Sequence, residues 1–274
     1  MASVLLSENL FSSIAFPLHS LVADEAGSGH EAFRVADGRR SPYDYWEPTT
    51  ANASHNLTLT CDRVRLCDML ALDRGHNLAA KQVKLECSDD NFTTTQTVFD
   101  IVLPSVTAVG SLDDAFGVRT EEGAWLKRFS PRVAKYWRLT IPALGSGLKQ
   151  KIVGLHLGKS YSFDPFRPWS PDQDELIGEE SMSDFGWSGS SAPAVRRQDT
   201  LTIQLSTDFD YELARYHFRH FGLRRPCWYV PDETQAQNAL MIVRPFGASG
   251  FGREPQWFAE RANIPYVEHE ASNG

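Results

Sequence analysis

Hydrophobic and polar residues alternate most regularly between residues 134 and 159. In 136–141, one face of an extended segment is apolar and carries Trp137 and Leu139, while the other face is largely polar. A second segment, 151–158, places Leu155 and Leu157 on one face. Such period-two patterns are typical of strands with one buried face. We therefore predict two core strands here, joined by residues 142–149 as a long hairpin or as a sheet crossover.

Strand patterns at 57–61, 82–88 and 98–103 precede this pair and are separated by turn residues. Residues 64–72 are a second apolar run, and residues 121–128 lead into the pair. Short strands at this spacing are typical of an antiparallel all-β sandwich. The sequence thus predicts a β-sandwich over residues 30–160, with the apolar faces of the two strands described above in its core.

The first 29 residues are apolar without a regular period and are interrupted by Pro17. We interpret residues 1–29 as an N-terminal arm or as first strands. The arm either packs on a neighbouring subunit or packs on its own domain. On the first interpretation, deleting residues 1–21 would cost assembly more than it costs the fold.

The character of the chain changes after the predicted sandwich. Residues 161–194 are punctuated by proline and aromatic residues and predict an extended linker. Residues 195–274 predict a small α+β oligomerisation unit. Its expected strands are 200–205, 227–230, 240–243 and 266–268, and its helix begins at a capping pair, Thr207 and Asp210, and ends at Gly222.

Composition excludes several classes of protein. The 274-residue chain has a net charge of −8, which argues against a general nucleic-acid-binding protein. No apolar run reaches the roughly 18 residues that a membrane helix needs. The first 21 residues lack a basic region and include Glu8, so we expect no signal peptide and synthesis in a cytoplasm.

Motifs of catalysis are missing from the sequence. It contains no nucleophile elbow in a strand–turn–helix context, no zinc-protease helix motif, no P-loop and no dinucleotide-binding glycine motif. We expect a protein that is not an enzyme.

No two of the four cysteines have the Cys-x-x-Cys spacing; they are Cys61, Cys67, Cys87 and Cys227. The pattern supports neither a zinc site nor an iron–sulfur cluster. We expect buried, reduced thiols and no disulfide.

An ordered set of motifs carries a family resemblance. The set comprises Val35-Ala36-Asp37-Gly38 before Trp46, the strand 57–60, the turn 75–78, Ser88-Asp89-Asp90, Tyr136-Trp137-Arg138-Leu139-Thr140-Ile141 and the closing segment 152–158. Over residues 30–160 it resembles the discoidin-type, galactose-binding-like jelly-roll sandwich, in particular the variant found in tail-tip proteins of long-tailed bacteriophages. Residues 195–270 resemble the ring-forming part of phage distal tail proteins. The implied fold is mainly β: a discoidin-like jelly-roll sandwich plus a small C-terminal α+β unit with extended arms.

The resemblance implies a structural virion protein of the tail tip or baseplate. It would assemble as a homo-oligomeric ring, contact other phage tail proteins and connect the tail tube to the tip or fibres. The alternative is a carbohydrate-binding module that attaches to host-surface glycans, and a third candidate is an accessory domain of a polysaccharide-degrading enzyme.

Two candidate sites follow from the turn after Val35. The family often holds a structural calcium ion there, which implies Asp37 and Ser41 as oxygen ligands; otherwise Asp37 caps its own turn. No other cofactor is expected. Tyr43, Tyr45 and Trp46 are candidate glycan contacts, although Trp46 is equally suited to plug the sandwich core.

Interface candidates lie nearer the C-terminus. Arg215, Arg219 and Arg224 form a basic cluster in an acidic protein, and Trp169 and Trp187 are aromatic residues of the linker. The arginines either face solvent or contact the acidic stretch 172–184 of another subunit.

Overall fold

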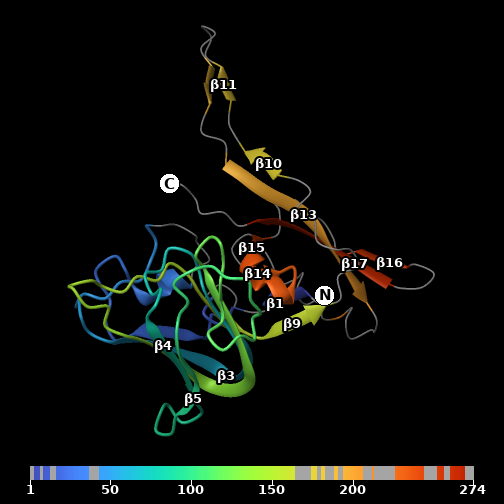
Figure 1. Ribbon diagram of the computed structural model, residues 1–274. Coiled ribbons are helices and arrows are strands. Elements are labelled where there is room, and N and C mark those ends of the chain that lie inside the picture. Colours follow the sequence, from blue (N-terminus) through green and yellow to red (C-terminus); the bar gives the residue numbers. More distant parts are fainter. Residues whose placement is uncertain are drawn as a thin grey trace.

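We analysed a computed structural model of the chain (Figure 1). The structure describes residues 3–6, 9–12, 17–36, 43–163, 174–177, 180–182, 188–190, 194–205, 212, 226–243, 252–255 and 260–268. Side chains are described for residues 9–12, 17–36, 43–162, 212 and 226–242.

A seven-stranded antiparallel sheet forms the sandwich, in the order β2-β3-β7-β4-β5, with β6 added beside β7 and β8 beside β3. Its strands are β2 (Ser20–Ala23), β3 (His55–Leu72), β4 (Gln82–Ser88), β5 (Gln96–Val102), β6 (Val118–Arg119), β7 (Trp125–Ile141) and β8 (Leu155–Gly158). The prediction of a mainly β chain built on an antiparallel sandwich is confirmed.

The two longest strands, β3 and β7, run the length of this sheet and pair with each other. Their pairing shifts register between Thr60 and Arg65 and again between Cys67 and Met69, where bulges interrupt the ladder. Residues 57–61, predicted as a strand, and residues 64–72, noted as a separate apolar run, are therefore one bulged strand. Strand β8 pairs with β3 and not with β7, so residues 142–154 are a crossover and the hairpin alternative is wrong.

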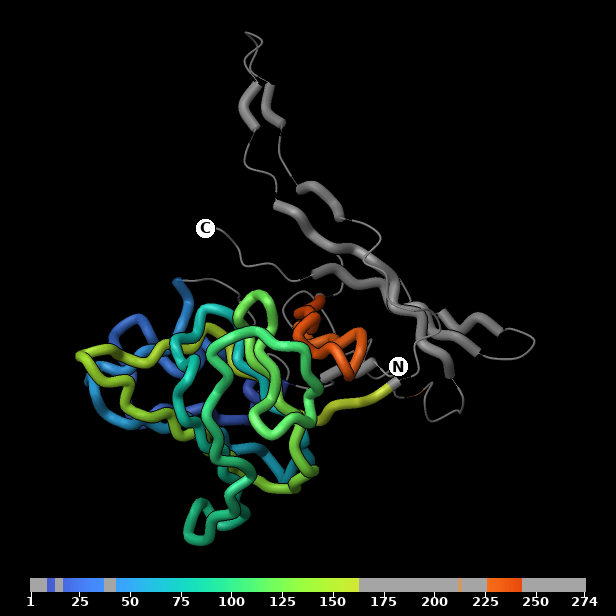
Figure 2. Tube along the Cα trace, in the orientation of Figure 1, coloured from blue at the N-terminus to red at the C-terminus, as the bar shows by residue number. Residues whose placement is uncertain are grey.

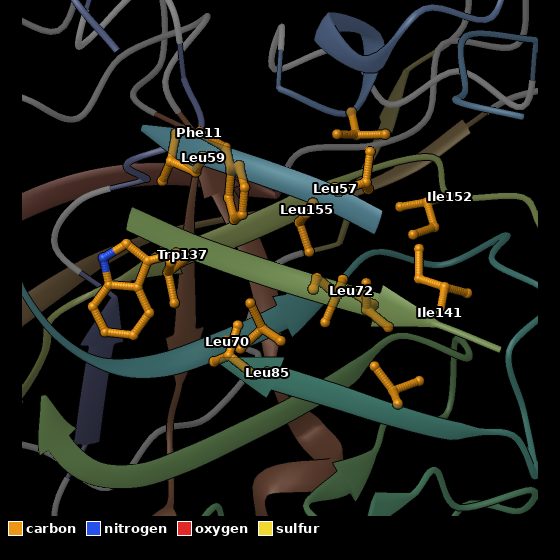
Figure 3. Close-up of a cluster of buried hydrophobic side chains, with 14 of the residues drawn as sticks. Phe11, Leu57, Leu59, Leu70, Leu72, Leu85, Trp137, Ile141, Ile152 and Leu155 are labelled. Atoms are coloured by element: carbon orange, nitrogen blue, oxygen red, sulfur yellow. The ribbon is translucent and has the colours of Figure 1, made fainter. Parts of the chain in front are cut away.

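The main hydrophobic core lies between the layers of the sandwich (Figure 3). Trp137 and Leu139 of β7 and Leu155 and Leu157 of β8 are each at most 1% exposed, as predicted from their alternation. The buried residues of β7 alternate with half-exposed ones from residue 136 to residue 141, so the period-two pattern is the direct cause of the burial.

A second, eight-stranded sheet has the order β10-β13-β17-β15-β14-β1-β9, with β16 beside β17. Its strands are β1 (Ser3–Leu6), β9 (Ser160–Phe163), β10 (Asp174–Ile177), β13 (Ala194–Leu205), β14 (Cys227–Val230), β15 (Leu240–Val243), β16 (Gly252–Pro255) and β17 (Glu260–Glu268). Strands β11 (Glu180–Met182) and β12 (Ser188–Ser190) pair with each other. The strands predicted at 200–205, 227–230, 240–243 and 266–268 are all present, and the segment 161–194, predicted as a linker, contributes strands of its own.

The N-terminal segment packs against other parts of the same chain. Strand β1 lies between β9 and β14, and residues 9–12 place Leu10 and Phe11 in the main core, 1% and 3% exposed. The interpretation of residues 1–29 as an arm on a neighbouring subunit is therefore wrong for these residues. The expectation that deleting residues 1–21 costs assembly more than it costs the fold loses its basis, because the deletion would empty part of the core.

A smaller second core joins the sandwich to the C-terminal strands. It packs Met69, Ala71 and Leu126 of the sandwich against Trp228 and Met241. The 3-10 helix η2 (Glu233–Asn238) adds Ala236 to it. The outward face of the second half of β3 is thus covered by residues from the far end of the sequence, which explains why Cys67–Leu72 is buried on both faces.

An ion network fastens the same junction. Arg128 of β7 donates to Asp113 at 2.5 Å and 2.7 Å and to Glu233 at 3.0 Å and 3.3 Å, and the Ser162 hydroxyl donates to Glu233 at 2.7 Å. The hydrogen bond to Asp113 is the main cause of the raised pKa of Arg128, which keeps the guanidinium charged.

The helix predicted to begin at Thr207 lies outside the described residues, except for Glu212, which is helical and exposed. The described helical segments are otherwise η2 and the 3-10 helix η1 (Ala32–Val35). No helix in the described part of the chain is long and apolar enough to cross a membrane.

Candidate functional site

Three loops gather at one end of the sandwich, at the left of Figure 2: residues 24–36, 43–54 and 142–154. The backbones of Trp46 and Ile152 exchange hydrogen bonds of 2.9 Å and 3.1 Å, which join the second loop to the third. The side chain of Gln150 donates to the carbonyls of Ala53 at 2.6 Å and Pro142 at 2.7 Å. The loops therefore form one fixed surface, held by buried polar contacts.

Trp46 anchors this surface from below. It is fully buried, and its indole N–H donates to the Glu25 carbonyl at 3.0 Å. Burial leaves Trp46 no face for a ligand, so its assignment as a glycan contact is wrong and its alternative role as the plug of the core is the one observed.

Tyr45 lies in the middle of an aromatic and cationic stack. Its ring stacks on His30 with 4.2 Å between the ring centroids and an interplanar angle of 21°. The ammonium of Lys151 lies over the same ring, 4.0 Å from its centroid. A cation at this distance is attracted by the electrons of the ring. Residues from the two other loops, His30 and Lys151, therefore hold the Tyr45 ring.

A charged pair closes the neighbouring part of the surface. Arg34, at the end of η1, donates to Asp44 at 2.5 Å and to Glu31 at 3.0 Å. The hydrogen bond from Arg34 to Asp44 is the main cause of the raised pKa of the guanidinium. Both acids hold Arg34 in place, and the contact with Asp44 joins the loop 24–36 to the loop 43–54.

Two exposed aromatic residues are the sequence neighbours of this charged pair. Phe33 is 53% exposed, and Tyr43 is 72% exposed. The guanidinium carbon of Arg34 lies 5.5 Å from the centroid of the Phe33 ring. We define the loop face by its seven residues: His30, Phe33, Arg34, Tyr43, Asp44, Tyr45 and Lys151.

The structure brings two of the predicted glycan contacts, Tyr43 and Tyr45, onto this face. Sequence reasoning missed Phe33, Arg34 and Asp44, although they lie close in sequence to the turn that follows Val35. The mixture of aromatic and charged residues beside a turn was the available signal. It also missed Lys151, because a residue so far along the chain joins the face only through the fold.

The predicted calcium ligands Asp37 and Ser41 lie outside the described residues, as do the interface candidates Trp169, Trp187, Arg215, Arg219 and Arg224. Within the part of the chain that is described, no three His, Cys, Asp or Glu side chains gather as metal ligands would.

The four cysteines are free thiols. Cys61, Cys67 and Cys87 belong to the main core. Burial raises the pKa of Cys61 to about 12 and also raises the pKa values of Cys87 and Cys227. Metal ligands and nucleophiles are thiolates, so these environments favour neither role.

We expect four thiols to react with a thiol reagent in denaturant and the native protein to react far more slowly at pH 8. The reason is that burial blocks access and the raised pKa of Cys61 lowers its thiolate fraction. A spectrophotometric thiol count with and without denaturant measures both. A count of two in denaturant would show a disulfide, and fast reaction of the native protein would contradict the burial.

No family model matches the sequence, and no curated protein matches it. Among solved structures, the chain is similar to chitosan-binding module 1 of a chitosanase/glucanase from Paenibacillus sp. IK-5, with 18% identity and a TM-score of 0.41, over 55% of this chain and 98% of that one. It is also similar to the module CpGH89CBM32-5 of Clostridium perfringens in complex with GalNAc-β-1,3-galactose, with 11% identity and a TM-score of 0.39, over 51% of this chain and 94% of that one.

A third similar structure is the GH29 fucosidase E1_10125 of Ruminococcus gnavus, with 14% identity and a TM-score of 0.42, over 56% of this chain and 27% of that one. In all three cases the similarity covers about half of this chain. None of these comparisons indicates a phage tail protein.

Proposed function

We propose that the protein is a non-catalytic carbohydrate-binding protein and that the loop face contacts the sugar. The observation that carries the proposal is the pair of exposed rings, Phe33 and Tyr43, which are the sequence neighbours of the ion-paired residues Arg34 and Asp44. Sugar rings present C–H groups that stack on aromatic faces and hydroxyl groups that exchange hydrogen bonds with charged side chains. A fixed surface with a few oriented polar groups among aromatic rings suits such a ligand.

Replacing Tyr43 with alanine is expected to weaken glycan binding by about tenfold or more, because a stacked aromatic anchor typically carries more than 1 kcal/mol of binding energy. The same loss is expected for Phe33→Ala. The measurement is a glycan array with the full chain, followed by titration calorimetry of the sugar that binds best.

Phe116→Ala supplies the matched control, since Phe116 is another phenylalanine, 58% exposed, outside the loop face. It should leave affinity unchanged. The absence of any glycan bound by the wild-type chain, or equal losses in all three variants, would reject the proposal.

A structural role in a phage tail tip is the second proposal, with the protein made in the host cytoplasm and carried in the virion. The observation that favours it is the eight-stranded sheet outside the sandwich, which a simple sugar-binding module does not require. Electron microscopy of virions labelled with antibodies against the chain tests it: label at the tail tip is expected, and label absent from virions would contradict it.

A further inference from the structure

The bulges of β3 and β7 expose consecutive residues on one bend of the sandwich. Residues 62–64 of β3 and residues 130–133 of β7 are all exposed, in place of the alternation seen elsewhere in both strands. A bulge re-aims side chains in this way, because the inserted residues have no opposite partner. We call the surface formed by Arg63, Val64, Leu66, Arg132 and Val133 the basic ridge.

Apolar side chains are exposed together on the basic ridge. Val64 is 54% exposed, Leu66 38% and Val133 57%, and Leu66 and Val133 are cross-strand partners. Single exposed apolar residues are ordinary, but neighbours on adjacent strands form a continuous patch that gains free energy when it is covered.

Two cations on the ridge are not neutralised within the described residues. Arg65, beside them, is paired with Asp62 at 3.0 Å, whereas Arg63 and Arg132 make no ion pair with any described residue. The whole chain carries a net charge of −8, so the sign of this patch is opposite to that of the protein as a whole. Such a surface attracts acidic partners.

An acidic, partly apolar stretch of the same sequence has complementary chemistry. Residues 172–184 contain six acidic residues and no lysine or arginine, and they include Leu176, Ile177 and Met182. Parts of this stretch are extended strands, β10 and β11, and β10 ends the strand order of its sheet. The sequence of the stretch therefore supplies both carboxylates and apolar residues, and its described parts, 174–177 and 180–182, are strands.

We propose that the basic ridge of one copy binds residues 172–184 of a second copy. The two surfaces differ, so the contact is heterologous and repeats head to tail, closing into a ring or continuing as a chain. The proposal is independent of sugar binding, because the loop face takes no part in it.

The test is sedimentation of the full chain over a range of salt concentrations without added sugar. We expect assemblies at low salt and monomers near 1 M NaCl, where the Debye length is about 3 Å. The double reversals Arg63→Glu with Arg132→Glu and Glu179→Lys with Glu180→Lys should each abolish assembly at low salt. An equimolar mixture of the two reversed proteins should restore complexes, because each then supplies the partner that the other needs.

Reversing Arg74 and Lys149 to glutamate is the matched control, since it makes the same change in net charge away from the ridge. This control should assemble like the wild type, and unchanged melting curves exclude misfolding. A wild type that stays monomeric at low salt, or a ridge reversal that still assembles, overturns the proposal. Failure of the mixture to form complexes overturns residues 172–184 as the occupant. The same conclusion follows if the wild-type chain binds an unrelated acidic peptide more tightly than it binds a peptide of residues 172–184.

Discussion

Replacing Trp137 with alanine is expected to lower the free energy of unfolding by about 3–5 kcal/mol. Trp137 is 1% exposed and lies in β7 between Leu59 of β3 and Cys87 of β4. Its indole N–H donates within its own strand, to the Ala134 carbonyl at 3.3 Å, so truncation removes that hydrogen bond together with the apolar contacts. Urea denaturation followed by circular dichroism measures the loss.

Tyr136→Ala is the control for Trp137→Ala. Tyr136 is the preceding residue of the same strand, but it is half-exposed on the outer face, where its ring meets Phe92 edge-on with 6.3 Å between centroids. Its replacement should cost about 1 kcal/mol or less. Equal losses in the two variants would contradict the assignment of the buried face.

Local patterns predicted the strands whose faces differ in polarity. The bounds predicted for β4, β14 and β15 agree with those observed, because alternation and flanking turn residues mark both ends of each strand. The bulges of β3 were not predictable in the same way. They replace alternation by runs of exposed or buried residues, and the burial on both faces depends on the C-terminal segment that packs there.

Pairings between distant segments were the part that the sequence did not reveal. Strand β1 pairs with β9 and β14, and a short apolar segment carries no information about which edge it joins. The loop face shows the same limit. Tyr43 and Tyr45 were predicted from a turn. Trp46 is also aromatic and follows Tyr45 directly, but its side chain is buried and its backbone pairs with Ile152, which lies far along the chain.

Deleting residues 1–12 is expected to abolish cooperative folding. The deletion removes the buried side chains of Leu10 and Phe11, each worth about 2–5 kcal/mol in a core, and takes β1 out of its sheet. The sum approaches the 5–15 kcal/mol that stabilises a typical domain.

Hydrogen bonds to β8 are lost in the same deletion: the Leu10 amide donates to the Leu157 carbonyl at 2.8 Å, and the Asn9 side chain donates to the Leu155 carbonyl at 3.2 Å. Both carbonyls belong to core residues, and a buried acceptor left without its donor costs a further 1–3 kcal/mol or so. Thermal denaturation of the truncated chain should therefore show no sharp transition.

Two full-length variants separate the loss of the core from the loss of the strand. Leu10→Ala with Phe11→Ala keeps β1 and should melt cooperatively at a lower temperature, with a free energy of unfolding reduced by about 4–10 kcal/mol. Leu18→Ala should change nothing, since Leu18 is 79% exposed. A truncated chain that melts like the wild type would show that the segment only lies against the sandwich, because residues that complete a core cannot be removed without cost.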